Sequence, residues 1–392
     1  MSQRLRQQHP SNNSIAAVAE NQPKPERPVS KTAMKHFYSF REFSNDLLAY
    51  IHSQKNDSER FNELALALFQ LQLDNVPSYR KLCERVLRAS KVELWSHIPS
   101  VPTSAFKDFE LTSLALDQRT HVFHSSGTTE QRPSRHFHSD ESLKIYEASL
   151  MRWFSEKCFE LGEPSPRFIS LTPPPSLAPH SSLVHMFGAI AHLHETVFTG
   201  TIGADRAWVV NADKTIALLE MFCNQREPVA VVGTAFGFVH LLDEMTARKV
   251  RFELPTGSRV LETGGYKGRS RVVPKRELHN LISERFGIAP TQIISEYGMS
   301  ELSSQAYDNP DRVFHFPPWA RAQIISPETG KEVSVGEIGL VRIFDLANVY
   351  SALAIQTEDL AIRRDGGFEL LGRATEAEPR GCSLMATEAS IH

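Results

Sequence analysis

The spacing of apolar residues divides the chain into segments of different character. Residues 1–34 contain no Phe, Trp or Tyr and are rich in Gln, Asn, Ser and Pro, so we expect a disordered tail. In residues 35–120 the apolar residues recur mainly at helical spacing, as at Phe61, Leu64 and Leu68. We predict that this second segment is a helical lead-in to a larger domain.

Two helices of the lead-in have recognisable starts. Asp57 or Ser58 is a suitable N-cap for the first helix, because a short polar side chain can accept a hydrogen bond from a free amide of the first turn. Pro77 favours the start of the second helix. The spacing in this second helix turns three apolar residues inward: Leu82, Val86 and Leu87.

In residues 121–310 short apolar runs alternate with helical patterns, which predicts an α/β domain with a parallel sheet covered by helices. The predicted strands are 167–171, 207–210, 228–232, 259–262 and 292–295. Ligands of such sheets bind beyond the carboxyl ends of the strands. The loops that follow Phe123, Glu262 and Ser295 are therefore the places to expect a site.

The chain becomes rich in strand patterns after residue 310. Two apolar runs flank Asp365-Gly366-Gly367, which is a strong hairpin signal. We predict that residues 311–373 form a smaller antiparallel subdomain. Residues 374–392 are polar and have no clear period, which is typical of a short tail.

Composition excludes several classes of protein. Lys and Arg number 43 against 46 Asp and Glu, so the chain lacks the basic excess that nucleic-acid binding favours. The longer apolar stretches fall short of the ~20 residues that span a bilayer. The four cysteines are far apart and offer neither zinc spacing nor a dense disulfide framework. These features predict a cytoplasmic protein that does not bind nucleic acid and has no membrane-spanning segment.

A hydroxyl-rich loop follows the apolar pair 122–123. Its glycine lets backbone amides approach an anion, and its hydroxyls can donate hydrogen bonds to phosphate oxygens. The loop is not the P-loop of kinases and GTPases, because GxxxxGK[ST] does not occur. An ordinary Ser/Thr-rich turn is the alternative interpretation. The candidate phosphate-binding residues are Ser125, Ser126, Gly127, Thr128 and Thr129.

Three further segments change this interpretation. The loop, YGMSE at 297–301, QTEDL at 356–360 and GR at 372–373 resemble the signature segments of the adenylate-forming enzyme superfamily, and they occur in the same order. Residues 37–392 resemble in particular its LuxE-type acyl-protein synthetase branch. The resemblance implies the large N-terminal domain of that superfamily, an α/β fold with a β-rich subdomain, with most of the usual C-terminal domain absent.

The resemblance implies roles at the phosphate end of an ATP site. The hydroxyl-rich loop would hold the β- and γ-phosphates. Glu301 would coordinate Mg²⁺, a cation that prefers carboxylate and phosphate oxygens. Arg373 would lie at the hinge near the phosphates. The structural alternatives are an acidic residue in the first turn of a helix for Glu301 and a surface arginine for Arg373.

At the nucleoside end, Tyr297 and Gly298 would pack on the adenine by the same resemblance. Asp359 would accept hydrogen bonds from both ribose hydroxyls, which suits a carboxylate. Gly264 and Gly265 would let the adenine or the acyl group approach the backbone. A half-buried strand aromatic, a solvated hairpin acid and a plain tight turn are the respective alternatives.

The chain departs from the superfamily pattern in two ways. Glu130 stands where a glycine usually follows the loop, so an acid lies next to the expected polyphosphate; Arg132 and Arg135 are nearby cations that could compensate. Longer members carry a lysine in the C-terminal domain that promotes adenylation, whereas the last lysine here is Lys331.

Cys382 is the candidate acyl acceptor. In the LuxE-type branch a cysteine near the C-terminus carries the acyl group as a thioester, and Arg380 would favour the thiolate of Cys382. A buried, inert thiol is the alternative, and it suits the remaining cysteines, which lie within helical patterns: Cys83, Cys158 and Cys223.

The predicted function is ATP-dependent activation of a fatty or aryl carboxylic acid to an acyl-adenylate, followed by transfer of the acyl group to Cys382. An acyl reductase or acyl-transferase would be the partner protein. We expect the acyl pocket to come from residues 167–190 and 233–240, with Phe236 and Phe238 as candidates. Two alternatives stay open: a ligase that delivers the acyl group to a carrier protein or small molecule, and a non-catalytic carboxylate- or nucleotide-binding protein.

Overall fold

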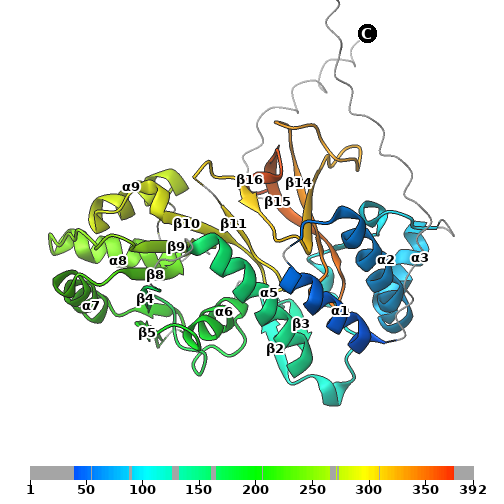
Figure 1. Cartoon of the computed structure of the whole chain (residues 1–392), viewed down its shortest axis with the longest axis horizontal. Coiled ribbons are helices and arrows are strands. Elements are labelled where there is room, and N and C mark those ends of the chain that lie inside the picture. The colour runs from blue at the N-terminus through cyan, green and yellow to red at the C-terminus, as the bar shows by residue number, and fades with distance from the viewer. Residues whose placement is uncertain are drawn as a thin grey trace, which may run out of the picture. The chain divides into compact units, whose positions relative to one another are not determined.

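The computed structural model describes residues 39–53, 55–87, 91–125, 132–159, 165–204, 206–264, 271, 273–308 and 310–374 (Figure 1). The tails predicted at 1–34 and 374–392, apart from Ala374, lie outside these residues, as does Cys382. Within the described part of the chain, no helix is both long enough and apolar enough to cross a bilayer.

Three helices form the N-terminal part of the described chain: α1 (Phe40–Ser53), α2 (Ser58–Asn75) and α3 (Pro77–Leu87). The helix starts at 58 and 77 confirm the predictions, and the side chain of Asp57 caps α2 by accepting from the amide of Arg60 at 3.0 Å. The predicted inward face of α3 is wrong at Val86, which is 61% exposed. Tyr79 and Cys83 are the buried residues of this helix, which packs against α2, whereas Val86 lies in its last turn.

The five parallel strands of the main sheet follow the order β5-β4-β8-β9-β10. Their bounds are β4 (Arg167–Ser170), β5 (Thr196–Phe198), β8 (Val229–Thr234), β9 (Arg259–Thr263) and β10 (Ile293–Tyr297). The helices that follow or precede them are α5 (Asp140–Cys158), α6 (Ser182–Ala191), α7 (Ala212–Gln225), α8 (Ala235–Ala247) and α9 (Lys275–Phe286). The predicted α/β alternation is thus confirmed for four of the five predicted strands.

Side chains alternate between the two faces of this sheet, as the twofold period of a strand requires. Val232 and Leu261 pack in one core with Phe154 of α5. Val231 and Val260 point the other way, into a core with α7, α8 and α9. We call these the α5 face and the α9 face.

The antiparallel strands continue the same sheet in the order β10-β11-β12-β16-β15-β14-β13, and β1 pairs with β15. Their bounds are β1 (Val101–Pro102), β11 (Ala306–Asp308), β12 (Phe314–His315), β13 (Ala320–Ile325), β14 (Ile338–Asp345), β15 (Ala354–Arg364) and β16 (Gly367–Arg373). The predicted hairpin at 365–367 is confirmed. The boundary predicted at 310 does not separate two sheets, because β10 and β11 are hydrogen-bonded neighbours.

The predicted strand at 207–210 is not part of the main sheet, and this prediction is wrong in its topology. Strand β7 (Trp208–Val210) pairs antiparallel with β6 (Gly200–Ile202) in a small separate sheet. The strand that pairs with β4 on the side away from β8 is instead β5, which the sequence analysis missed because it has only three half-buried residues.

A second two-stranded sheet joins β2 (His121–His124) to β3 (Arg135–His138). The short remaining helices are η1 (Trp95–His97), α4 (Ala105–Asp108), η2 (Leu116–Gln118) and η3 (Pro290–Gln292). The N-terminal helices are fixed to the loop between β14 and β15 through Gln72, whose side-chain amide donates to the carbonyls of Asn348 and Val349 and accepts from the backbone amide of Leu353.

Candidate active site

The strands β2 and β3 hold both ends of the candidate phosphate loop. The hydroxyl of Ser125 accepts from the amide of Ser134 at 3.0 Å, and the amide of Ser125 donates to the carbonyl of Ser134 at 3.4 Å. The loop therefore closes a hairpin. Of the predicted phosphate-binding residues, four lie outside the described residues: Ser126, Gly127, Thr128 and Thr129.

The structure brings Glu301 against the base of this hairpin. The hydroxyl of Ser134 donates to Oε1 of Glu301, across 167 residues of sequence. Oε2 of Glu301 accepts from the hydroxyl of Ser300 at 2.9 Å. His136 on β3 donates from Nδ1 to the carbonyl of Ser300 at 2.9 Å, so the hairpin is also tied to the main chain beside Glu301. Glu301 is buried, with an exposed fraction of 6%.

A buried aspartate fixes the segment that follows Glu301. Oδ2 of Asp345 accepts from the amides of Ser303 and Ser304 at 2.9 and 2.8 Å. Oδ1 accepts from the hydroxyl of Ser304 at 2.7 Å and from the amide of Ala347 at 3.0 Å. These four bonds hold the turn after β10 against the end of β14. Sequence analysis missed Asp345, because nothing local distinguishes it from an exposed acid at a strand end.

Tyr297 and Asp359, which are 62 residues apart, are also in contact. The phenol of Tyr297 donates to Oδ2 of Asp359 at 2.8 Å, and the amide of Asp359 donates to the hydroxyl of Thr357 at 3.1 Å. Burial, followed by the charge of Asp359, raises the pKa of Tyr297 well above its ordinary value. Arg373 lies beside them, with Nε 3.9 Å from Oδ1 of Asp359, and its side chain is 67% exposed.

The ring of Tyr297 is already packed against three phenylalanines, at centroid distances of 5.4 to 6.3 Å. These are Phe314, Phe316 and Phe368. Strands β12 and β16 thus supply a rigid support for Tyr297. The adenine contact that the resemblance implies for this residue stays a prediction.

Two of the predicted glycines have a physical reason to be glycine. Gly264 has a φ of +69°, a left-handed conformation that disfavours other residues. A Cβ at Gly298 would lie 2.3 Å from Oε1 of Glu296, so that carboxylate rests directly on the backbone of Gly298. Gly265 lies outside the described residues.

Glu296 was not among the predicted site residues. The hydroxyl of Thr263 on β9 donates to its Oε2. Burial is the main reason why the pKa of Glu296 is raised to about 7, and the nearby charge of Glu262 adds to the shift while the Thr263 hydrogen bond opposes it. The one sequence signal that could have identified Glu296 is an acidic residue within a predicted strand of mainly apolar residues.

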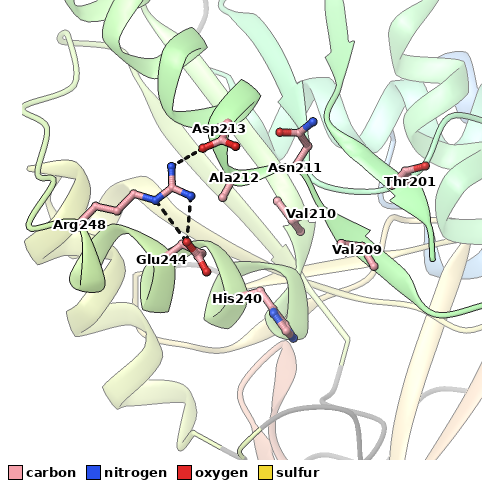
Figure 2. A pocket seen from close by; sticks show the side chains of 9 residues that line it. All are labelled: Thr201, Val209, Val210, Asn211, Ala212, Asp213, His240, Glu244 and Arg248. Carbon is pink, nitrogen blue, oxygen red and sulfur yellow. Dashed lines mark hydrogen bonds and ion pairs between the residues drawn. The ribbon is translucent and has the colours of Figure 1, made fainter. Parts of the chain in front are cut away.

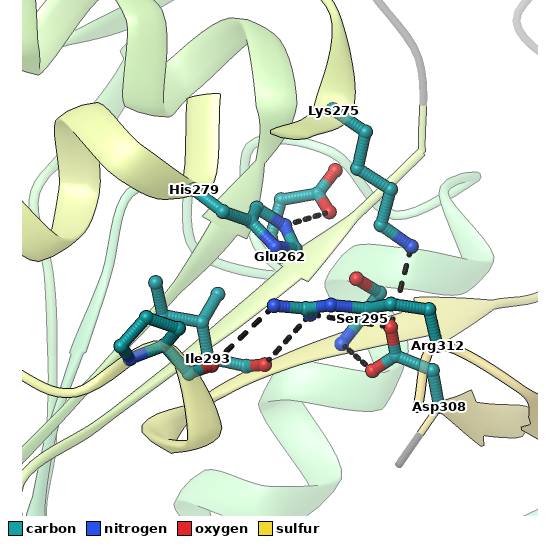
Figure 3. A network of polar contacts seen from close by, with 8 residues as sticks. Glu262, Lys275, His279, Ile293, Ser295, Asp308 and Arg312 are labelled. Carbon is teal, nitrogen blue, oxygen red and sulfur yellow. Dashed lines mark hydrogen bonds and ion pairs between the residues drawn. The ribbon is translucent and has the colours of Figure 1, made fainter. Parts of the chain in front are cut away.

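A polar network on the α9 face fixes the strands that carry the site (Figure 3). Asp308 of β11 accepts from the amide of Ser295 at 2.6 Å. Lys275 at the start of α9 and Arg312 each lie 3.4 Å from its other oxygen. Glu262 of β9 contacts His279 of α9 at 3.4 Å. The network joins α9 to β9, β10 and β11.

Of the two arginines named as possible compensating cations, Arg135 has partners of its own. Arg135 lies 3.7 Å from Glu110 and 5.6 Å from the ring of Phe137. Glu130, which Arg135 could compensate, lies outside the described residues. No group of three His, Cys, Asp or Glu residues suited to a metal ion occurs in the described part of the chain.

The described cysteines are not activated thiols. Burial raises the pKa of Cys83 to about 12 and raises that of Cys158 further. Burial also raises the pKa of Cys223, which is only half-buried. Each is free in the structure, in agreement with the predicted inert role.

A cavity of about 470 Å³ lies between the start of α7 and α8 (Figure 2). Arg248 on its rim pairs with Asp213 and Glu244. None of the predicted ATP-site residues lines this cavity, although His240 belongs to the stretch 233–240 that was expected to contribute to the acyl pocket. Its lining consists of Thr201, Val209, Val210, Asn211, Ala212, Asp213, His240, Glu244 and Arg248.

The predicted acyl-pocket residue Phe238 is wrong, because its side chain is fully buried in the core of the α9 face. Phe236 is half-buried and contacts the ring of His240 at 4.5 Å. The structure therefore leaves Phe236 as the candidate of the pair.

Known structures share this fold. A 2-hydroxyisobutyryl-CoA ligase in the postadenylation state, in complex with 2-HIB-AMP, superimposes with a TM-score of 0.58 at 14% identity, over 80% of this chain and 68% of that chain. The same ligase with 2-HIB-AMP and CoA gives a TM-score of 0.58 over 81% and 69%. ATP-bound MatB from Rhodopseudomonas palustris is a weaker match, with a TM-score of 0.45 at 17% identity over 67% of this chain and 49% of that chain, and the assignment of the fold does not depend on it. The fold is that of the large N-terminal domain of adenylate-forming enzymes.

The family model "Acyl-protein synthetase, LuxE" matches residues 41–390, so the chain belongs to this family. The long-chain-fatty-acid–luciferin-component ligase of Vibrio harveyi is 23% identical over 352 residues, which cover 86% of this chain and 90% of the relative. The Aliivibrio fischeri ligase of the same name is also 23% identical, over 85% and 89%.

These findings confirm the predicted family and fold class. They also confirm the predicted class of enzyme, an ATP-dependent ligase that activates a carboxylic acid and transfers the acyl group. They favour this enzyme over the non-catalytic binding protein.

Proposed function

We propose that the chain activates its acid at the carboxyl ends of β9 and β10 and transfers the acyl group to Cys382. A carboxylate oxygen of the acid attacks the α-phosphorus of ATP, and the bond to the β-phosphate oxygen breaks, which releases pyrophosphate. The sulfur of Cys382 then attacks the acyl carbon as a thiolate. The bond to the AMP oxygen breaks, AMP leaves with that electron pair, and a thioester remains.

The observation that carries this proposal is the contact between Ser134 and Glu301. It places the hydroxyl-rich hairpin and a buried carboxylate at one point, although they are far apart in sequence. A polyphosphate needs both hydrogen-bond donors and a centre that offsets its charge. The loop would supply the donors, and Glu301 would supply the attachment for a cation.

The residues at Glu301 fit Mg²⁺. This ion is usually bound through one or two carboxylates together with substrate phosphates, so a group of three protein ligands is not required. Each oxygen of Glu301 accepts one hydroxyl, which leaves lone pairs available on both. When bound, Mg²⁺ would stabilise the negative charge that develops on the departing pyrophosphate.

For the nucleoside end we propose Asp359 as the acceptor of the ribose hydroxyls, with Tyr297 as its positioning residue. The contact with Tyr297 occupies Oδ2 and fixes the carboxylate in one orientation. Arg373 lies next to Oδ1 and is largely exposed, so its guanidinium can turn toward a bound phosphate. The role of Gly264 and Gly265 is to let the ligand approach the end of β9.

The choice of Cys382 is supported by the other cysteines. Burial holds the thiols of Cys83 and Cys158 in the unreactive protonated form, so they are poor nucleophiles. The family match extends to residue 390 and includes Cys382. We further propose that an acyl reductase or acyl-transferase takes the acyl group from the thioester.

Intact-protein mass spectrometry tests the proposal. The protein is incubated with Mg²⁺-ATP and a panel of carboxylic acids, beside Cys382→Ala and the matched control Cys223→Ala. We expect an ATP-dependent mass gain that hydroxylamine removes and that only Cys382→Ala abolishes. A gain retained in Cys382→Ala would refute this acceptor. Acid-dependent release of pyrophosphate without a mass gain would support the ligase that delivers its acyl group to another molecule.

A further inference from the structure

The carboxyl ends of β8, β9 and β10 present polar side chains on the α5 face. Thr234, Thr263 and Glu296 occupy this edge, each two residues beyond an apolar residue of the same face: Val232, Leu261 and Ile294. An acyl group attached to the α-phosphate would reach the sheet at this edge, because Gly264 and Gly298 flank it. This inference rests on the proposed function and specifies the acid.

Glu296 is unusual at this edge because its carboxyl group is buried. Its exposed fraction is 7%, and Thr263 is its hydrogen-bond partner among the described residues. Besides burial, the like charge of Glu262 raises the pKa of Glu296. A buried carboxyl without a cation is destabilising unless hydrogen bonds compensate for the lost hydration.

One oxygen of Glu296 is available to a ligand. Oε2 accepts from Thr263, whereas Oε1 has no hydrogen-bond partner among the described residues and rests on Gly298. A side chain at 298 would occupy the space next to Oε1. The carboxylate is therefore held in place with a free acceptor beside the segment that carries Tyr297 and Glu301.

Aromatic rings fill the interface between the sheet and α5 below this edge. A void lined by Phe154, Phe159 and Phe168, near the amino ends of the strands, has a volume of about 10 Å³, which is room for about one water or less. Arg259 donates to the carbonyl of Cys158 at the same end. A long alkyl chain that followed this face toward the amino ends of the strands would have to displace these rings.

We propose that the acid which this enzyme activates is short and carries a hydroxyl or amino group that donates a hydrogen bond to Oε1 of Glu296. Such a donor satisfies the buried carboxyl when the acid binds. An unsubstituted fatty acid leaves Oε1 without a partner and buries it further. Sites built to hydrogen-bond a polar substrate group discriminate strongly against analogues that lack the group.

Matched pairs of acids test the inference through the rate of pyrophosphate release. Butyric and 3-hydroxybutyric acid, and benzoic and 3-hydroxybenzoic or 3-aminobenzoic acid, differ in the donor; tetradecanoic acid is the long-chain comparison. We expect kcat/KM to be about ten to a hundred times higher for a donor-bearing acid than for its unsubstituted partner. Tetradecanoic acid should be the poorer substrate.

Two substitutions identify the residue. In Glu296→Gln the preference should fall several-fold, and in Glu296→Leu the ratio should approach one. Glu262→Gln is the matched control, since Glu262 is a buried carboxyl of the neighbouring strand that faces α9, and it should keep the wild-type ratio. Glu296→Gln keeps the size of the side chain, so it remains informative if Glu296→Leu fails to fold.

The outcomes separate this inference from the proposed function. Activation of tetradecanoic acid at least as fast as of the hydroxy acids would overturn the inference and leave the proposed function in place. An unchanged ratio in both Glu296 variants would do the same. Failure of every acid to release pyrophosphate would overturn the proposed function, and this inference with it.

Discussion

Asp345 gives the most direct test of how the site is held together. Asp345→Asn retains one acceptor oxygen and replaces the other by an amino group. Each carboxylate oxygen accepts two hydrogen bonds, from Ser303, Ser304 and Ala347. The amino group would face two donors in either orientation of the amide, so two of the four bonds are lost.

The expected effect follows from the strength of such bonds. Two hydrogen bonds to a charged group, at about 1.5–3 kcal/mol each, amount to about 3–6 kcal/mol. Removal of the buried charge offsets part of this loss. We therefore expect the free energy of unfolding to fall by at least about 2 kcal/mol, a large share of the ~5–15 kcal/mol of a typical domain. Denaturant titration followed by tryptophan fluorescence measures it.

Asp365→Asn is the matched control. It makes the same chemical change in the exposed hairpin turn of the same sheet, where less than about 0.5 kcal/mol should be lost. Asp345→Asn should also slow acid-dependent pyrophosphate release, because the turn that Asp345 fixes follows Glu301 directly. Equal stability of the two variants would show that the four bonds are not what holds this turn.

Two further predictions concern the groups around β10. Tyr297→Phe removes the hydrogen bond to Asp359, so KM for ATP should rise about tenfold with a smaller change in kcat, together with a stability loss of about 1 kcal/mol; an unchanged KM would exclude a positioning role. The pKa of Glu296, raised by burial to about 7, means that the folded state binds this proton more tightly than the unfolded chain. The resulting stabilisation is fully present below the ordinary pKa of 4.5 and is lost as the pH rises through about 7. Glu296→Gln should therefore be more stable than the wild type at pH 8, by up to about 3 kcal/mol, and the difference should shrink toward pH 5; thermal unfolding that shows a pH-independent difference would contradict this.

Local patterns predicted the local features well. The cap at Asp57 and the hairpin at 365–367 depend on residues that are close in sequence, so the local sequence is enough to predict them. The family-like segments predicted that Glu301 and the hydroxyl-rich loop serve one ATP site. In the structure Glu301 contacts Ser134 at the base of the hairpin that carries this loop, and the roles of the individual residues stay predictions.

Features that depend on distant partners could not be predicted in this way. The apolar run at 208–210 has the composition of a core strand, yet it pairs with β6 because β5 already occupies the edge next to β4. Glu296 and Asp308 are acids in buried strands, and only the three-dimensional contacts with Thr263 and Ser295 explain how each is tolerated.

Strand β10 and the turn after it are the point where all these contacts converge. The strand is parallel to β9 on one side and antiparallel to β11 on the other, so it joins the two halves of the sheet. Tyr297 contacts the antiparallel half of the sheet through a hydrogen bond to Asp359, and Glu301 contacts the β2–β3 hairpin through a hydrogen bond from Ser134. Since Tyr297 and Glu301 are only four positions apart in the sequence, a shift of either half should move both proposed ends of the site, the nucleoside end and the phosphate end, together. This coupling gives a physical reason why the short segment from Tyr297 to Glu301 is the part of the chain most informative about function.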